Sequence, residues 1–229
     1  MRDQLTAGII TYHEPYSYGA DLQCLGLQLF LEGLGYKAEI IDYSMGAYQE
    51  LRRKRPFRSL LQRGIRFFND PKRFLKVKRN ASEITRQALP FQEQLEIRNQ
   101  KFKEFQDKYY NLSPQRYENY SDLKNNCPVY SAYICGSDQI WNPGFCDMDE
   151  NYFLGFAPKG RRIAYAPSFG VQELPRVWRR EYRKRLNNID FLSVREKTGA
   201  EMIKKLRGGG KNSSSCYGSC VFDFLRSMA

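Results

Sequence analysis

The sequence predicts an α/β fold built on a Rossmann-like parallel sheet with helices on both faces. Short apolar runs alternate with segments of helical periodicity, and a strand–helix–strand order of βαβ length opens the chain. Polar, glycine-containing segments directly follow several of the expected strands. With 229 residues, of which 41% are hydrophobic and 14% aromatic, the chain can bury a core and does not have the composition of a disordered protein.

The first βαβ unit occupies residues 5–43. Residues 5–11 and 37–43 are apolar runs with β-branched side chains, which suits strands that are covered on both faces. Between them apolar residues recur at helical spacing, and Gly35 follows where a helix is expected to stop. The residues expected to face the core from this helix are Leu22, Leu25, Leu29, Phe30 and Leu34.

Three further strands are expected at residues 130–135, 162–166 and 191–194. Each is an apolar run followed at once by a polar segment, and a helix over 200–206 follows the last of them. In an open parallel sheet, ligands bind in the crevice beyond the carboxyl ends of the strands. By position alone, the polar segments are therefore the candidates for a binding site.

The segment from about residue 46 to 110 interrupts this alternation and is expected to be a helical insertion. Within 51–80, twelve Lys and Arg residues are opposed by a single acid, Asp70, and a second basic cluster runs over 176–185. The formal net charge of the whole chain is +12. Either an ordinary solvated face of helices or a contact with an anionic partner, such as an acidic polysaccharide, a membrane surface or nucleic acid, accounts for the basic insertion.

The chain is divided accordingly into two parts. Residues 1–206 are expected to form an N-terminal Rossmann-like domain that carries the insertion, and residues 207–229 an irregular tail. The tail is rich in glycine and serine and has no sustained helix or strand period, so we expect it to be disordered or aberrant.

The sequence also predicts a compartment. No apolar run approaches the roughly 18–20 residues that span a bilayer, and the first residues lack the apolar core of a signal peptide. We therefore expect a cytoplasmic protein with reduced cysteines. Cys24 and Cys135 lie in apolar surroundings and are expected in the core, whereas Cys216 and Cys220 form only a weak zinc motif, and no metal site is expected.

Residues 11–19 join the first strand to the first helix and are a candidate anion site. Gly19 would allow a ligand close to the backbone amides of the helix N-terminus, and a plain strand-to-helix turn is the alternative. The spacing matches neither the dinucleotide nor the Walker fingerprint, so neither NAD nor ATP is supported. His13, the only histidine, lies in this loop beside Glu14 and could act as an acid or base, or simply form a hydrogen bond.

The densest group of polar side chains follows the third strand, in the nine residues GSDQIWNPG at 136–144. A structural turn accounts for Asn-Pro-Gly, and Trp141 could serve for packing. The segment nevertheless offers more hydrogen-bonding groups than a turn needs, which favours sugar hydroxyls or a phosphate ester as ligands. The groups concerned belong to Ser137, Asp138, Gln139 and Asn142.

Arg195 and Glu196 follow the last strand. Arginine in this position could hold a carboxylate or phosphate through two parallel hydrogen bonds. The alternative is an ion pair between Arg195 and either Glu196 or Asp190.

Four blocks of the sequence, in this order and spacing, resemble the polysaccharide pyruvyl transferase family. They are GIITYHEPYSYGADLQCLGLQLFLEGLGYKAEIIDY, YICGSDQIWNP, YFLGFAPKGRRIAYAPSFG and FLSVREKTGAEMI, and they cover roughly residues 5–206. The combination is more specific than any single block. The resemblance implies transfer of a pyruvyl group from phosphoenolpyruvate to a pair of sugar hydroxyls on a surface polysaccharide, as a ketal. It also implies that the sheet is one half of a glycosyltransferase-B-like, two-domain fold.

The resemblance further implies the participants and the site. Phosphoenolpyruvate is the donor substrate and no cofactor is implied; the acceptor is a polysaccharide or a lipid-linked oligosaccharide, and contact with the inner face of the membrane is expected. Ketal formation needs an acid and a base, and Asp138, Glu196 and His13 remain alternatives for these roles. The residues indicated for substrate binding are Gly19, Gln23, Gly136, Ser137, Gln139, Trp141, Asn142 and Arg195.

The resemblance ends near residue 206, where family members continue into a second domain with further contacts to phosphoenolpyruvate. We therefore expect a truncated chain that is inactive on its own. The alternative function is a non-catalytic, anion-binding module that uses the basic segment 51–80. The sequence indicates neither the acceptor sugar and linkage nor the oligomeric state.

Overall fold

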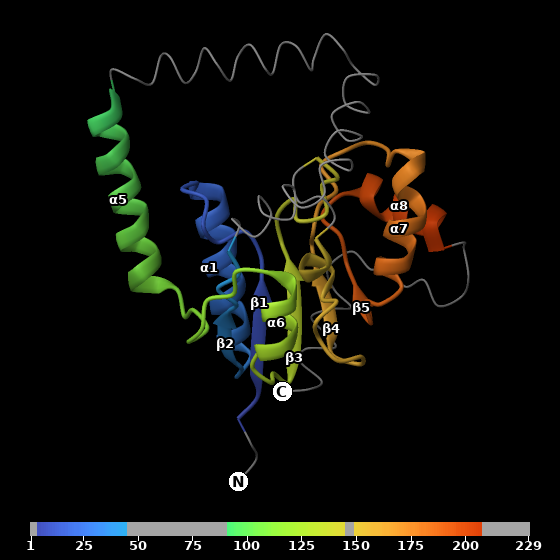
Figure 1. Ribbon diagram of the computed structural model, residues 1–229, viewed down its shortest axis with the longest axis horizontal. Coiled ribbons are helices and arrows are strands. Elements are labelled where there is room, and N and C mark those ends of the chain that lie inside the picture. The colour runs from blue at the N-terminus through green and yellow to red at the C-terminus, as the bar shows by residue number, and fades with distance from the viewer. Residues whose placement is uncertain (1–3, 45–90, 145–148, 208–229) are drawn as a thin grey trace. The chain divides into compact units, whose positions relative to one another are not determined.

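Five parallel strands form a single sheet in the order β2-β1-β3-β4-β5 in the computed structural model, which describes residues 4–44, 91–144 and 149–207 (Figure 1). The strands are β1 (Thr6–Ile10), β2 (Lys37–Ile40), β3 (Ala132–Gly136), β4 (Arg162–Tyr165) and β5 (Phe191–Leu192). The predicted α/β, Rossmann-like fold is therefore confirmed, and all five expected strands are present with ends displaced by up to three residues.

The helices in the described part of the chain occupy the connections between these strands. They are α1 (Tyr18–Gly33), α5 (Gln92–Tyr109), α6 (Tyr120–Asn126), the 3-10 helix η2 (Glu150–Phe153), α7 (Arg176–Leu186) and α8 (Lys197–Arg207). Helix α8 was expected from the sequence; α6, η2 and α7 were not, because the first two are short and α7 has few apolar residues.

The strand order places a topological switch point between β1 and β3. From β1 the chain moves to β2 on one side, and from β3 it moves to β4 and β5 on the other. In doubly wound sheets of this order, the loops that follow the two central strands diverge and leave the ligand crevice between them. The loops after β1 and β3 are the two segments in which sequence reasoning found the densest polar motifs.

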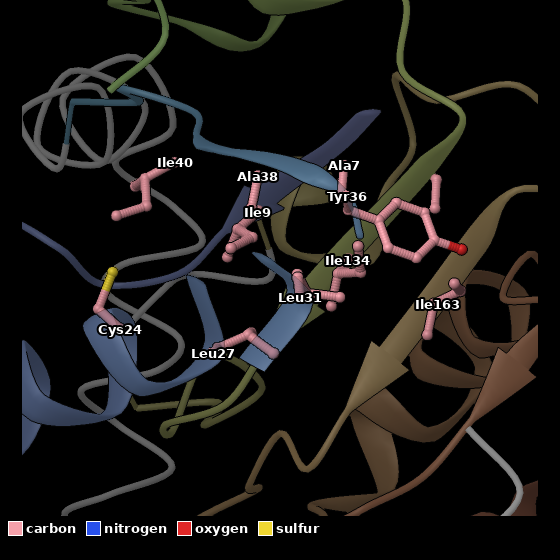
Figure 2. Packing of buried hydrophobic residues seen from close by; sticks show 11 residues of the cluster. Ala7, Ile9, Cys24, Leu27, Leu31, Tyr36, Ala38, Ile40, Ile134 and Ile163 are labelled. Carbon is pink, nitrogen blue, oxygen red and sulfur yellow. The ribbon is translucent and has the colours of Figure 1, made fainter. Parts of the chain in front are cut away.

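Helix α1 covers one face of the sheet, where the apolar core cluster lies (Figure 2). The cluster combines Leu27 and Leu31 from α1 with alternate residues of the strands, such as Ile9 and Ile134. Cys24 is fully buried in this cluster, as predicted, and burial raises the pKa of its thiol to about 12, so that it stays protonated. Cys135 is likewise fully buried, on β3.

The side of α1 that faces the core was predicted only in part. Phe30 and Leu34 pack against the core cluster as expected. Leu22 and Leu29 are instead exposed, at 63% and 55% of their surface, whereas Leu31, outside the expected set, is fully buried. The apolar spacing of α1 fits two overlapping stripes, and periodicity alone does not choose between them because both repeat at helical intervals.

The opposite face of the sheet is covered by the segment that contains η2. Tyr133 of β3 meets Phe156 with ring centroids 5.8 Å apart and an edge-on geometry. The buried Arg162 of β4 donates from Nε to the carbonyl of Ala157 at 2.8 Å, so that its guanidinium has a hydrogen-bond partner in the segment that covers this face of the sheet.

The free edge of β2 is covered by residues 111–117. Ile40 and Tyr43 form isolated parallel bridges with Leu112 and Tyr117. Such a cover satisfies backbone groups that an edge strand would otherwise expose, and it carries Arg116 to the carboxyl end of β2.

Residues 50–109 form a separate compact unit from the rest of the chain, and only α5 and the residue before it are described there. This helix agrees with the expected helical character of 46–110, and Arg98 lies over the ring of its one buried residue, Phe102, at 4.7 Å. The basic segment 51–80, the tail 208–229 and the cysteines Cys216 and Cys220 lie outside the described residues. No helix in the described part of the chain is long and apolar enough to cross a membrane.

Candidate functional site

The loops that follow the two central strands are joined by the side chain of Gln23, on the second turn of α1. Its Nε2 donates to Thr11 Oγ1 at 3.1 Å, at the end of β1. Its Oε1 accepts from Ser137 Oγ at 2.7 Å, directly after β3. One amide thus links both sides of the switch point, and it uses both of its polar atoms to do so.

Gly136 allows the loop after β3 to turn away from the sheet. It has a φ of +118°, and a Cβ built on it would lie 2.0 Å from the carbonyl oxygen of Tyr165 on β4. Any side chain here would collide with the neighbouring strand, so the glycine is required by geometry. This requirement is independent of any contact between Gly136 and a ligand.

Asp138 follows with its backbone in the left-handed region, at a φ of 67°. Its Oδ1 accepts from the main-chain N of Gln139 at 2.6 Å, and its carbonyl accepts from the main-chain N of Ser168 at 2.7 Å. The second contact joins the loop after β3 to the loop after β4. Together the two contacts hold the backbone and the carboxylate of Asp138 in place.

Gln139 and Asn142 form a pair of side-chain amides under Gly170. Asn142 Nδ2 donates to Gln139 Oε1 at 2.8 Å, and Asn142 Oδ1 accepts from the main-chain N of Gly144 at 2.8 Å. A Cβ on Gly170, whose φ is +61°, would lie 2.4 Å from both of the paired amide atoms. The loop after β4 therefore approaches these amides as closely as only glycine permits.

Trp141 occupies the interior beneath this loop. It is 1% exposed, its Nε1 donates to the carbonyl of Tyr152 at 2.8 Å, and its ring stacks on Phe153 with centroids 5.3 Å apart. These contacts give Trp141 a packing role. The predicted contact between Trp141 and substrate stays a prediction.

The carboxyl ends of β4 and β5 are joined by Ser193 and Arg195. Ser193 Oγ accepts from the main-chain N of Ala166 at 3.0 Å and donates to the carbonyl of Ala164 at the same distance. The Arg195 guanidinium is half exposed and forms an ion pair from Nε to Glu196 Oε1 at 3.0 Å. This is the pairing expected as one alternative, and it leaves the two terminal nitrogens of Arg195 without a hydrogen-bond partner among the described residues.

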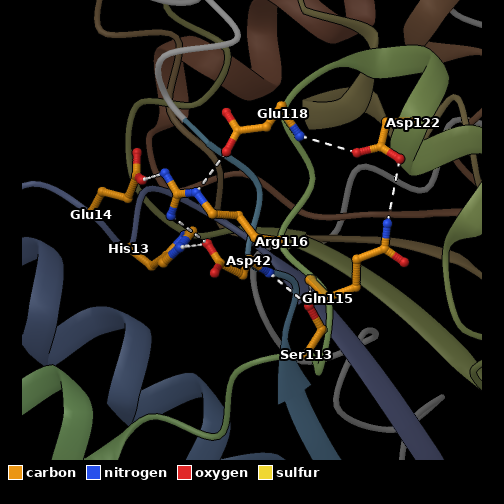
Figure 3. Close-up of polar contacts among 8 residues, drawn as sticks. All are labelled: His13, Glu14, Asp42, Ser113, Gln115, Arg116, Glu118 and Asp122. Carbon is orange, nitrogen blue, oxygen red and sulfur yellow. Dashed lines mark hydrogen bonds and ion pairs between the residues drawn. The ribbon is translucent and has the colours of Figure 1, made fainter.

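A second polar cluster lies at the carboxyl ends of β1 and β2 (Figure 3). His13 is 4% exposed, and its Nε2 lies 3.2 Å from Oδ1 of Asp42, which lies two residues after the end of β2. Arg116 NH1 donates to the same oxygen at 3.0 Å, while NH2 pairs with Glu14. His13 and Glu14 are neighbours in the sequence, and the carboxylate that partners His13 in the structure is that of Asp42.

The electrostatics of this cluster favour charged side chains. Burial alone would raise the pKa of Asp42, but the hydrogen bond from His13 and the charge and hydrogen bond of Arg116 together hold it below its usual value. The hydrogen bond to Glu14 raises the pKa of Arg116 further above its ordinary range. Asp42 is therefore an ionised carboxylate that is held on two sides.

Sequence reasoning missed Asp42 and Arg116. The expected strand over 37–43 included Asp42, whereas β2 ends at Ile40 and so leaves Asp42 at the ligand-binding edge of the parallel sheet. Arg116 carried no signal, since its position depends on residues 111–117 running along the edge of β2.

The predicted residues thus fall into two larger groups, with the Arg195–Glu196 pair and Gly19 outside them. The structure joins Gln23 and Ser137 directly, and connects the rest of the 136–142 motif to the loop after β4; it places His13 in the other cluster, with Asp42. Gly19 stands apart: a Cβ built on it meets no atom within 4 Å, so packing does not require a glycine there. No group of three His, Cys, Asp or Glu residues suited to a metal ion occurs within residues 4–44, 91–144 and 149–207.

Comparison with known proteins identifies the family. The family model for polysaccharide pyruvyl transferase matches residues 18–227. The chain belongs to the polysaccharide pyruvyl transferase family. No curated protein and no solved structure matches it.

The extent of the family match bears on the candidate residues. It includes Gln23, the 136–142 motif and Arg195 with Glu196, and it runs past residue 206, where the resemblance in the sequence ended. It begins after His13 and Glu14. As a member of the polysaccharide pyruvyl transferase family, this chain therefore places most of its candidate residues inside the matched region and its only histidine outside it.

Proposed function

We propose that the protein transfers the pyruvyl group of phosphoenolpyruvate to two hydroxyls of a polysaccharide or lipid-linked oligosaccharide, as a ketal. One hydroxyl oxygen bonds to C2 of the enol while C3 gains a proton and becomes a methyl group. The second hydroxyl oxygen then bonds to C2 as the C2–O bond to phosphate breaks. The protons of the two hydroxyls end on C3 and on the released phosphate, so no cofactor, oxidant or reductant is needed.

The observation that carries this proposal is the position of the family's motif at the switch point of the sheet. The matched residues Gln23 and Ser137 meet where the carboxyl ends of β1 and β3 diverge, and this is where doubly wound folds bind ligands. Phosphoenolpyruvate carries a carboxylate and a phosphate. The unpartnered terminal nitrogens of Arg195 are suited to either group.

The acid and the base of the reaction are proposed among Asp138, Glu196 and His13. Asp138 is held by its neighbours with one carboxylate oxygen engaged, and Glu196 pairs with Arg195, so that each keeps one carboxylate oxygen for a proton or a hydroxyl. Gly19, Gly136, Gln139, Trp141 and Asn142 are proposed to bind or to support the substrates. For Gly136 and Trp141, close packing supports the second of these roles.

A location at the inner face of a membrane is proposed from the charge of α7. Two of its six basic residues are paired, Arg179 with Glu173 and Arg185 with Glu181. The other four are exposed at helical spacing on one side, and no carboxylate of the described residues pairs with them. These four residues, here called the α7 basic face, are Arg176, Arg180, Arg183 and Lys184.

The test is release of inorganic phosphate from phosphoenolpyruvate by the purified full chain, measured with and without an oligosaccharide acceptor and with mass analysis of the acceptor. We expect phosphate release that depends on the acceptor, and a product that carries a pyruvyl ketal. Arg195→Ala should raise KM for phosphoenolpyruvate. Arg161→Ala is the control and should leave KM unchanged, because Arg161 directly precedes β4, at the amino-terminal end of the strands and away from the proposed site. Phosphoenolpyruvate that neither binds nor turns over would refute the proposal for this chain.

The same assay addresses the proposed two-domain, glycosyltransferase-B-like arrangement. Binding of phosphoenolpyruvate without turnover is the outcome that the truncation hypothesis expects. A chain that turns over alone contradicts that hypothesis.

A further inference from the structure

His13, Asp42 and Arg116 form a chain of contacts to which the family match assigns no role, and His13 lies before the matched residues. We infer that Asp42 and Arg116 are positioning residues that hold His13 as its Nε2-protonated tautomer, so that Nδ1 takes the proton of an acceptor hydroxyl. The identity of the hydroxyl rests on the proposed function. The tautomer does not, and it can be tested separately.

The placement of the proton follows from the chemistry of the contact. Asp42 is ionised at neutral pH, and an ionised carboxylate has acceptor atoms only. The hydrogen in the 3.2 Å contact between Nε2 and Oδ1 therefore belongs to His13. In a neutral imidazole, Nδ1 is then the nitrogen with the free lone pair.

The Nδ1 atom of His13 is buried and has no hydrogen-bond partner among the described residues. An acceptor that is buried without a donor costs about 1–3 kcal/mol, so such atoms call for an explanation. A hydroxyl of a bound molecule is the donor that fits, because it gives a hydrogen bond in the ground state and a proton in the reaction.

The geometry also fixes the orientation of Asp42. Its main-chain N donates to Ser113 Oγ at 3.0 Å, and its main-chain O accepts from Tyr117 N at 2.8 Å. Arg116 NH1 holds the same carboxylate oxygen, Oδ1, that contacts His13. A carboxylate that is fixed through both its backbone and its side chain can orient an imidazole, as the aspartate of a Ser-His-Asp triad orients its histidine.

The other charged groups of the cluster act on Arg116. Glu14, on the His13 loop, pairs with NH2, and Glu118 Oε1 accepts from Nε at 2.9 Å. Three charged groups thus lie around the imidazole: Glu14 on its own loop, Asp42 at the end of β2 and Arg116 in residues 111–118. Glu118 lies farther out (Figure 3). Glu118 contacts the anchor without contacting His13, which makes it a matched control.

Nuclear magnetic resonance of the full chain labelled with ¹⁵N tests the tautomer directly. Because His13 is the only histidine, one set of imidazole signals reports on the site without assignment. We expect Nε2 protonated and Nδ1 unprotonated in the neutral ring. Asp42→Asn should yield a mixture of tautomers, since an amide can either accept from Nε2 or donate to it.

Two further variants keep this test decisive. Glu118→Gln removes a carboxylate from Arg116 but none from His13, and it should leave the tautomer unchanged. Arg116→Gln leaves the Asp42 carboxylate as an acceptor and should keep the Nε2-protonated form, and the wild-type ring alone decides the tautomer if Asp42→Asn does not fold. A wild-type ring protonated on Nδ1, or equal spectra for Asp42→Asn and Glu118→Gln, overturns the inference.

The proton transfer is tested by turnover. Asp42→Asn should lower kcat by up to about 10²–10⁴-fold, the usual contribution of acid–base catalysis, with little change in KM for phosphoenolpyruvate. Glu118→Gln should leave both unchanged. A kcat that survives Asp42→Asn refutes the role of His13 in proton transfer. The expected tautomer in a wild-type chain that neither binds nor turns over phosphoenolpyruvate refutes the proposed function and that proton transfer, while the positioning of His13 stands.

Discussion

The hydroxyl of Ser137 donates to the Oε1 atom of Gln23 at 2.7 Å, across 114 residues of sequence. This contact spans the point where the chain reverses its direction of winding, and it couples the first helix to the motif that follows β3. Since the other end of the Gln23 amide holds Thr11, a change at any one of the three residues should be felt at the other two.

We therefore predict coupling between Gln23 and Ser137. Gln23→Ala and Ser137→Ala should each lower the free energy of unfolding, and the double variant should lose less than the sum by about 0.5–1.5 kcal/mol, the net worth of one hydrogen bond. Urea unfolding of the four proteins measures this. Losses that add to within experimental error would show that the contact contributes nothing.

A second prediction concerns Gly170, which lies against the amides of Gln139 and Asn142. Gly170→Ala forces a β-carbon into that pair and places alanine at a positive φ, which by itself costs about 1–2 kcal/mol. Gly160→Ala is the matched control, because Gly160 has a φ of +81° and a Cβ there meets nothing within 4 Å.

Both glycine variants should be less stable than the wild type, because each places alanine at a positive φ. Gly170→Ala should lose more stability, because its methyl group also meets the paired amides. Thermal melts of the two proteins, together with KM for phosphoenolpyruvate, separate the effects. Equal melting temperatures and equal KM values would mean that the loop accommodates the methyl group and that the Gln139–Asn142 pair has no bearing on the site.

A third prediction separates packing from substrate contact at Trp141. Trp141→Phe leaves the carbonyl of Tyr152 without its donor and should cost about 1–3 kcal/mol of stability, while Trp141→Ala should cost about 3–5 kcal/mol. Trp178→Phe is the control, since the buried Trp178 indole makes no hydrogen bond among the described residues. If Trp141→Phe instead keeps its stability and raises KM, Trp141 is a substrate contact.

The strands and the motif after β3 could be predicted from sequence because each depends on local pattern. Apolar β-branched runs mark buried parallel strands, and polar residues directly after them are placed at one edge by topology alone. The same reasoning found Gly136 and Ser137 without knowledge of their partners.

Relationships between distant segments could not be predicted in this way. Asp42 partners His13 because β2 lies next to β1, and Arg116 reaches them because residues 111–117 follow the edge of β2. The buried side of α1 was predicted only in part for a related reason: two apolar stripes compete on this helix, and only the sheet decides which is covered. Sequence spacing contains no information about that choice.

A fourth prediction concerns the pH dependence of stability. The folded-state pKa of Asp42 lies below its unfolded value of about 3.9, so its contribution is present above that pH and is lost as pH falls through the folded pKa. The pKa of Asp149 is raised, chiefly by burial, against hydrogen bonds from Tyr43 and Asn151 that lower it. Its contribution is full below about pH 3.9 and is lost as pH rises through the folded pKa.

The two aspartates should therefore respond in opposite directions. Asp42→Asn should lower the free energy of unfolding at pH 7 and weaken its decline in acid. Asp149→Asn should not lower it at pH 7, because the amide can accept from the main-chain N of Asn151 and donate to the Tyr43 hydroxyl. Urea unfolding from about pH 7 down to about pH 2, a range that extends below the usual carboxyl pKa of about 3.9, compares them. A loss at Asp149→Asn as large as that at Asp42→Asn at pH 7 would contradict the assignment.

The last prediction concerns the α7 basic face. An anionic lipid surface attracts each nearby Lys or Arg by about 1 kcal/mol, so replacing Arg180 and Arg183 with Glu should lower the partition coefficient onto phosphatidylglycerol vesicles by roughly 30-fold or more. Lys204→Glu with Lys205→Glu makes the same change of net charge at exposed positions of α8 and is the matched control. Sedimentation with vesicles of phosphatidylglycerol and with vesicles of phosphatidylcholine, at low and high salt, measures both pairs. If the α7 basic face attracts the protein, only the variant changed in α7 should lose binding, and only to the anionic vesicles. High salt should also weaken the binding of the wild-type protein to these vesicles. Equal losses for the two pairs would mean that net charge alone brings the protein to the surface.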